Sequence, residues 1–274
     1  MSEVSSVSAA IAIQRRPSPL IVFGSGAVIG VLGGLIGLGG AEFRLPLLIG
    51  LFGFAALHAV ILNKAMSLVV VLTALPARLF ALPYSDIAAH WTVAANLLAG
   101  SLLGAWLGAS WATRMHSRTL YRVLAVLLVA IAAALLTTHL GHVGHLELPT
   151  LARVVTAVIA GAGIGIVAAL MGVAGGELLI PTIVLLFAVD IKIAGSLSLL
   201  VSLPTMLVAF ARYSRDNSFG VLRENIRFVV IMAAGSIAGT ILGGLLLGVV
   251  PAAALIPALA ALLLLSSVKV WRHE

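Results

Sequence analysis

The sequence contains no cysteine, which excludes disulfide bonds, thiol catalysis and cysteine-ligated metal sites. Charge is also scarce: only 9% of the 274 residues are Asp, Glu, Lys or Arg, against roughly 25% in soluble domains. A phosphate-binding loop of the G-x-x-x-x-G-K-[ST] type is missing, so ATP cannot drive this chain directly without a partner. Gly24-Ser25-Gly26 is not a G-x-S-x-G nucleophile elbow. These absences argue against a soluble domain and against the common hydrolases.

Apolar residues dominate what is present. They make up 62% of the chain, and the mean hydropathy is +1.21. A soluble protein would need polar helix faces to cover its apolar runs, and residues 245–265 offer none. The sequence therefore predicts an integral, all-α polytopic membrane protein. The net charge of +7 comes from clusters between apolar runs, which indicates membrane topology rather than nucleic-acid binding.

Ten apolar segments follow a polar tail of residues 1–19, five in each half. Because the first run continues to residue 38 without a small-residue cleavage site, we interpret it as a retained span and not as a cleavable signal peptide. The second and seventh segments are too short to cross a hydrocarbon core of about 30 Å, so they re-enter or cross only partly. We expect eight to ten membrane segments, drawn from residues 20–38, 45–60, 66–82, 91–112, 120–140, 151–173, 178–189, 193–211, 226–250 and 255–270.

A glycine-rich motif occurs twice. Residues 37–46 read GLGGAEFRLP and residues 172–181 read GVAGGELLIP, with Glu42 and Glu177 separated by 135 positions. Gly100 and Gly104 match Gly235 and Gly239 at the same offset, and small residues at four-residue spacing predict close helix contacts. The chain is therefore predicted to be a two-fold internal repeat, divided into residues 1–140 and 141–274.

The basic clusters have opposite distributions in the two halves. Arg and Lys occur near residues 15–16, 113–122, 211–227 and 269–272, whereas their repeat counterparts at residues 79–90, 141–150 and 249–254 hold none. By the positive-inside rule the basic loops and both termini are cytoplasmic. Matched loops then lie on opposite sides, which predicts inverted repeats.

Glycine clusters flanked by apolar segments predict interrupted helices. Free backbone groups at membrane depth require protein or water around them, so the breaks imply a cavity. Proline suits the first turn of a helix, so we expect new helices to start near Pro46 and Pro181, with their positive ends available to an anion. The alternative is that the glycines form tight turns at the membrane surface. The substrate-site candidates from these breaks are Gly37, Gly39, Gly40, Gly172, Gly175 and Gly176.

Charged residues beside the breaks are the remaining candidates. Glu42 and Glu177 occupy matched positions, and a carboxyl group among apolar segments favours its neutral form, so one or both could carry a coupling proton. Helix capping at the interface is the alternative. Arg44 and Lys64, the latter following Asn63, have no partner in the second half and could hold an anion, or could snorkel to the interface.

Two serines are candidate anion donors. Ser67 and Ser196 are predicted to begin the third segment of each half, where a hydroxyl can bind an anion or cap the helix. Matching them requires the repeat spacing to differ by six residues between the halves. His139, His142 and His145 lie in a glycine-containing linker that we interpret as solvated, so we expect neither a metal site nor a cofactor.

The motifs Gly172–Pro181, Ala194-Gly195-Ser196-Leu197 and Gly235-Ser236-Ile237-Ala238-Gly239 resemble those of the sulfite exporter (TauE/SafE) family. The resemblance extends from about residue 20 to the end, although the family's usual run of glycines is replaced by GGAE at residues 39–42. It implies a permease of the bacterial inner membrane that exports sulfite, a sulfonate or a related small organosulfur anion. Coupling to an ion gradient, such as protons, is expected, while the oligomeric state stays open, with a homodimer as one alternative.

Three functional classes compete. A secondary transporter accounts for the inverted repeat, the doubled break and the paired carboxylates. An anion channel could share the repeat, but the sequence has no ring-forming filter. A membrane enzyme would need a nucleophile with a base, and no matched histidine lies in a span. We therefore expect a transporter and no catalytic activity.

Overall fold

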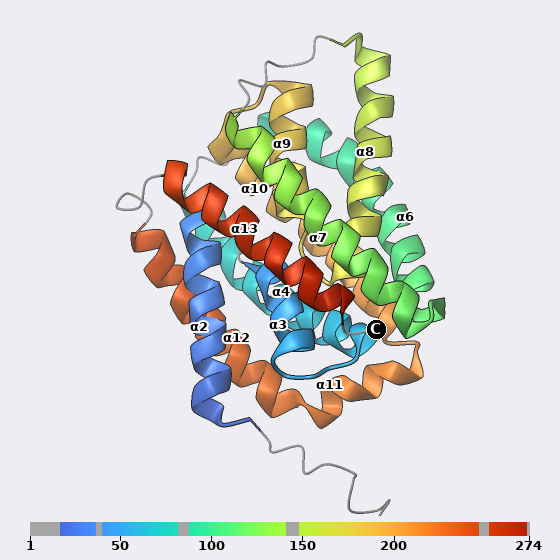
Figure 1. Ribbon diagram of the computed structural model, residues 1–274. Coiled ribbons are helices and arrows are strands. Elements are labelled where there is room, and N and C mark those ends of the chain that lie inside the picture. The colour runs from blue at the N-terminus through green and yellow to red at the C-terminus, as the bar shows by residue number, and fades with distance from the viewer. Residues whose placement is uncertain (1–16, 37–39, 82–87, 141–147, 247–251, 273–274) are drawn as a thin grey trace, which may run out of the picture.

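The computed structural model describes residues 17–36, 40–81, 88–140, 148–246 and 252–272, and it places ten main helices there (Figure 1). Six of them are long and apolar enough to cross a membrane, namely α4, α6, α7, α8, α10 and α12. The protein is thus an all-α polytopic membrane protein. The helices are α2 (Pro19–Ile36), α3 (Ala41–Gly50), α4 (Ala56–Ala81), α6 (Trp91–Arg114), α7 (Ser117–Leu140), α8 (Thr150–Met171), α9 (Gly176–Phe187), α10 (Ile191–Tyr213), α12 (Ile226–Leu245) and α13 (Ala252–Trp271); the short η1 (Asn217–Phe219) and α11 (Gly220–Glu224) precede α12.

Each predicted segment corresponds to one helix, but one boundary is wrong. The predicted gap between residues 60 and 66 lies inside α4, and the chain turns earlier, between α3 and α4. Gly53 has a φ of 71° in this turn, a conformation that glycine adopts without strain. Asn63 and Lys64 misled the prediction, because they interrupt the apolar pattern without interrupting the helix.

The repeat is more regular than the predicted spacing suggested. The four pairs of matched helices α3/α9, α4/α10, α6/α12 and α7/α13 all start 135 residues apart. The six-residue difference assumed between the halves is therefore wrong. The division at residue 140 remains a prediction, because residues 141–147 lie outside the described part of the chain.

Matched helices make matched contacts in the other half. A Cβ added to Gly30 of α2 would meet the backbone of Ser236 in α12, and one added to Gly165 of α8 would meet the backbone of Ser101 in α6. From the opposite side of each pair, a Cβ added to Gly239 of α12 would meet the backbone of Ala27 in α2, and one added to Gly104 of α6 would meet that of Ala162 in α8. Each first helix thus packs parallel to the fourth main helix of the opposite repeat, and these close backbone contacts confirm the predicted role of the spaced glycines.

Helices α3 and α9 are re-entrant. Gly40 lies beside Ile29 of α2, with 2.6 Å between a built Cβ and the Ile29 carbonyl oxygen. Ile29 lies about 15 Å from the start of α2, and α3 extends back toward that start over about the same length. Phe52 and Phe54, after α3, stack edge-on against Phe228 near the start of α12, where the parallel α2 also starts. Helix α9 likewise ends with Phe187 near Arg153 in the first turn of α8.

The two re-entrant hairpins enter from opposite ends. Arg212, at the end of α10, donates to Ser110 and Thr113 at the end of α6. Only the short η1 and α11 separate α10 from α12. The start of α12 therefore lies near the end of α6, opposite the end at which α6 and α8 start. Arg122 at the start of α7 lies over the Trp271 ring at the end of α13. Three of the four basic clusters therefore gather at one end, the lower side of Figure 1. This is an inverted repeat, as predicted.

Candidate functional site

Glycines start the two re-entrant helices. Gly40 precedes α3 with a φ of 69°, and Gly175 precedes α9 with a φ of 86°. The prediction that these helices start near the prolines was wrong, because Pro46 and Pro181 are each the sixth helical residue. A proline there removes the amide that would bond the carbonyl four residues earlier. Those carbonyls belong to Glu42 and Glu177.

Asn63 joins the two breaks. Its Nδ2 atom donates to the carbonyl oxygen of Ala41, the first residue of α3, at 3.0 Å. The same atom donates to the carbonyl oxygen of Met171, the last residue of α8, at 3.1 Å. The start of α3 and the end of α8 are therefore held together by one buried amide from α4.

Lys64 and Tyr213 donate to carbonyls at the second break. The last four carbonyls of a helix lack the usual partner; here the amides of Gly172 and Val173 donate to Ala169 and Ala168, and the two side chains add further donors. Lys64 Nζ donates to the carbonyl oxygens of Ala168 at 2.8 Å and Val173 at 2.7 Å, and Tyr213 Oη donates to Ala169 at 2.9 Å. A cation also suits the negative end of a helix dipole. Both side chains are fully buried. Lys64 therefore has a structural role, in which it stabilises the backbone at the break.

Arg44 has a different environment. Its Nη1 atom makes two long contacts, to Asn63 Oδ1 at 3.5 Å and to Ser67 Oγ at 3.4 Å. Its Nε and Nη2 atoms have no hydrogen-bond partner among the described residues, although the side chain is fully buried. A guanidinium group matches the oxygens of an oxyanion in a bidentate manner. Arg44 thus has two nitrogen atoms without a partner among the described residues, whereas the Lys64 ammonium already donates to two carbonyls.

Two buried carboxyl groups complete the site. Glu42 and Glu177 lie in the first turns of α3 and α9 and are close enough to interact with each other. Arg44 interacts electrostatically with Glu42, and Lys64 with Glu177. None of the four carboxylate oxygens has a donor within hydrogen-bond distance in the described part of the chain. The interaction between the two glutamates indicates that the first turns of α3 and α9 lie near each other.

A family model described as "Sulfite exporter TauE/SafE" matches residues 4–135 and 137–274, nearly the entire chain. The chain belongs to the TauE/SafE sulfite exporter family. It is therefore a membrane transporter of the sulfite or sulfonate type. No curated protein and no solved structure matches it.

Most of the site residues predicted for this TauE/SafE chain lie close together. The structure gathers Gly40, Glu42, Arg44, Asn63, Lys64, Ser67, Gly172, Gly175, Gly176 and Glu177 from α3, α4, the end of α8 and α9. Gly172 fits against the backbone of Val60 and Lys64 with a φ of 70°. Gly37 and Gly39 lie outside the described residues, as do His142 and His145.

The two serines do not begin helices as predicted. Ser67 lies in the middle of α4, and Ser196 is the sixth residue of α10. The Ser196 hydroxyl donates to the Lys192 carbonyl of its own helix at 3.4 Å. Tyr213 was missed as a site residue, because a tyrosine at a helix end with no repeat counterpart carries no sequence signal.

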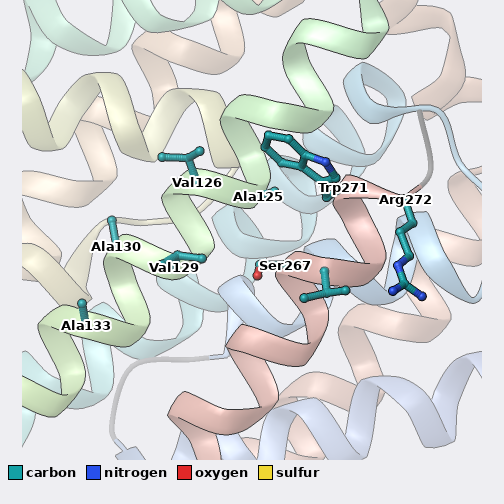
Figure 2. Close-up of a pocket in the computed structure, with 9 residues that line it drawn as sticks. Ala125, Val126, Val129, Ala130, Ala133, Ser267, Trp271 and Arg272 are labelled. Carbon is teal, nitrogen blue, oxygen red and sulfur yellow. The ribbon is translucent and has the colours of Figure 1, made fainter.

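A surface groove of about 480 Å³ lies between α7 and α13, and Figure 2 shows its lining side chains. The lining is mostly apolar, with Trp271 at the end of α13 and Arg272 directly after it. None of the candidate residues contributes to it. An apolar, open groove suits lipid acyl chains better than a hydrated anion, so we assign it no part in transport.

Proposed function

We propose that this TauE/SafE transporter exports a small organosulfur anion, such as sulfite or a sulfonate, through a site between the starts of α3 and α9. The observation that carries the proposal is Arg44, a fully buried guanidinium with two nitrogen atoms that have no partner among the described residues. Two helix N-termini converge beside it, and each favours negative charge. In this account Arg44 holds the anion, while Asn63, Lys64 and Tyr213 hold the backbone that surrounds it.

The paired carboxyl groups supply a route to proton coupling. Ionised Glu42 and Glu177 would repel an anion held at Arg44. Protonation removes that repulsion, so anion binding and proton binding favour each other, and the coupling is reciprocal. Anion and protons then move together, and an inward proton gradient opposes export, so outward flux requires an outward anion gradient that exceeds it.

The experiment uses purified protein in proteoliposomes and isethionate, a sulfonate whose charge stays fixed across the tested pH range. We expect saturable flux and an affinity that rises as the pH falls. Because glutamine cannot ionise, the double variant Glu42→Gln/Glu177→Gln should bind isethionate equally well at every pH. Unchanged pH dependence in that variant would exclude the glutamates from coupling, and non-saturable conductance would indicate a channel.

The basic end of the molecule is proposed to face the cytoplasm of a bacterium, with the chain in the inner membrane. It carries Arg215 and Arg223 beside the clusters on α6, α7 and α13, which the positive-inside rule assigns to the cytoplasm. Single cysteines at Asp216 and His142 can be introduced without interference, since the native chain has none. We expect a membrane-impermeant thiol reagent to label position 142 in intact cells and position 216 only after lysis. Labelling of both positions in intact cells contradicts the topology.

A further inference from the structure

Ser202 of α10 is the repeat counterpart of Ser67. Helices α4 and α10 start 135 residues apart, in the same register as α3 and α9, so position 67 corresponds to position 202. Both side chains are buried, at 3% and 1% exposure. The structure thus replaces the match between Ser67 and Ser196 with one between two buried serines in the middle of their helices.

The Ser202 hydroxyl differs from the others on its helix. Ser196, Ser198 and Thr205 each donate to a carbonyl of α10, at 3.4, 2.8 and 2.7 Å. A buried serine within a helix commonly makes such a bond. Ser202 Oγ has no partner among the described residues, which leaves a buried donor unsatisfied at a cost in free energy.

The two-fold arrangement explains why Ser202 lacks a partner. In the first repeat, Ser67 receives the guanidinium of Arg44 from the first turn of α3. The counterpart of Arg44 in the first turn of α9 is Leu179, which is buried and has no polar atoms on its side chain. By the repeat register, Ser202 holds toward α9 the position that Ser67 holds toward α3. Glu42 and Glu177, in the first turns of α3 and α9, interact with each other, so the two-fold relation assigns both serines to the same site.

We propose that Ser202 is a substrate-binding residue that donates its hydroxyl to a second oxygen of the anion held by Arg44. This rests on the proposed function and deepens it. One repeat supplies a cation and the other a neutral donor, so the favoured ligand carries several oxygens around one centre. A sulfo or sulfite group meets that requirement, because each of its oxygens can accept from a different donor.

The test measures isethionate affinity and thermal stability for Ser202→Ala. We expect a loss in affinity of roughly two- to twelve-fold, the range for one hydrogen bond. The melting temperature should stay the same or rise, because alanine removes an unsatisfied buried hydroxyl. A purely structural serine would not give these opposite effects. Ser202→Thr, which retains the hydroxyl, should recover most of the affinity.

Ser196→Ala and Ser198→Ala are matched controls on the same helix, and we expect wild-type affinity from both. Wild-type affinity in Ser202→Ala, or an equal loss in Ser196→Ala, overturns the assignment of Ser202 while leaving the proposed function intact. If the wild-type protein binds no sulfonate or sulfite, the proposed function itself fails. The two failures are therefore distinguishable.

Discussion

Replacing Arg44 by glutamine is expected to weaken isethionate binding roughly 10- to 100-fold. The substitution removes charge-assisted hydrogen bonds, worth on the order of 1.5 to 3 kcal/mol, from an anion that has left water. Within the protein the substitution removes two long contacts to Asn63 and Ser67 and the electrostatic interaction with Glu42, and glutamine keeps a polar group that can bond to Asn63 and Ser67, so the fold should survive. Equilibrium binding to purified protein in detergent measures the effect directly.

Two variants make the Arg44 result interpretable. Arg44→Lys keeps the charge but not the planar fork, so its affinity should fall between those of wild type and Arg44→Gln. Arg215→Gln removes an exposed arginine at the basic end and should leave affinity unchanged. Wild-type affinity in Arg44→Gln would remove Arg44 from the site, and the anion would then have to bind through backbone amides and hydroxyls alone.

Replacing Lys64 by methionine is expected to lower the free energy of unfolding by about 1 to 3 kcal/mol. The lysine donates to the carbonyls of Ala168 and Val173, but the Ala168 carbonyl also accepts from the Val173 amide. The Val173 carbonyl has no other donor among the described residues, and a buried carbonyl left without a donor costs about 1 to 3 kcal/mol. Methionine fills similar space but cannot donate. Denaturant unfolding in detergent, followed by tryptophan fluorescence, measures the difference.

The control for Lys64 is its repeat counterpart. Leu199 occupies the matched position on α10, and Leu199→Met conserves volume, so it should cost less than about 1.5 kcal/mol. We also expect the folded fraction of Lys64→Met to bind isethionate within a few-fold of wild type. Normal stability combined with lost binding would reverse the roles assigned to Lys64 and Arg44.

The arrangement of the chain could be predicted because the bilayer restricts it so strongly. Apolar runs separated by basic clusters identified ten segments and their inverted relation, and the doubled motif located both breaks. Glu42, Arg44, Asn63 and Lys64 stood out because polar side chains are rare in this chain. The resemblance in the glycine motifs agreed with the family that matches nearly the whole sequence.

The errors arose where tertiary contacts override local signals. Asn63 and Lys64 suggested a loop, but their polar groups bond to the two breaks and α4 continues through them. Pro46 suggested a helix start, yet the left-handed glycine before α3 starts that helix five residues earlier. Ser196 suggested a match to Ser67 because the short motif around it is similar. Only the helix starts reveal that Ser202 holds the matched position.

The central claim is that one anion site lies where α3 and α9 begin. Selenite, the selenium analogue of sulfite, scatters X-rays anomalously, so crystals grown with it would locate the bound anion directly. The account predicts an anomalous peak within hydrogen-bond distance of the Arg44 guanidinium and the Ser202 hydroxyl, between Gly40 and Gly175. A peak only elsewhere, for example among Arg212, Arg215 and Trp106 at the basic end, would contradict it.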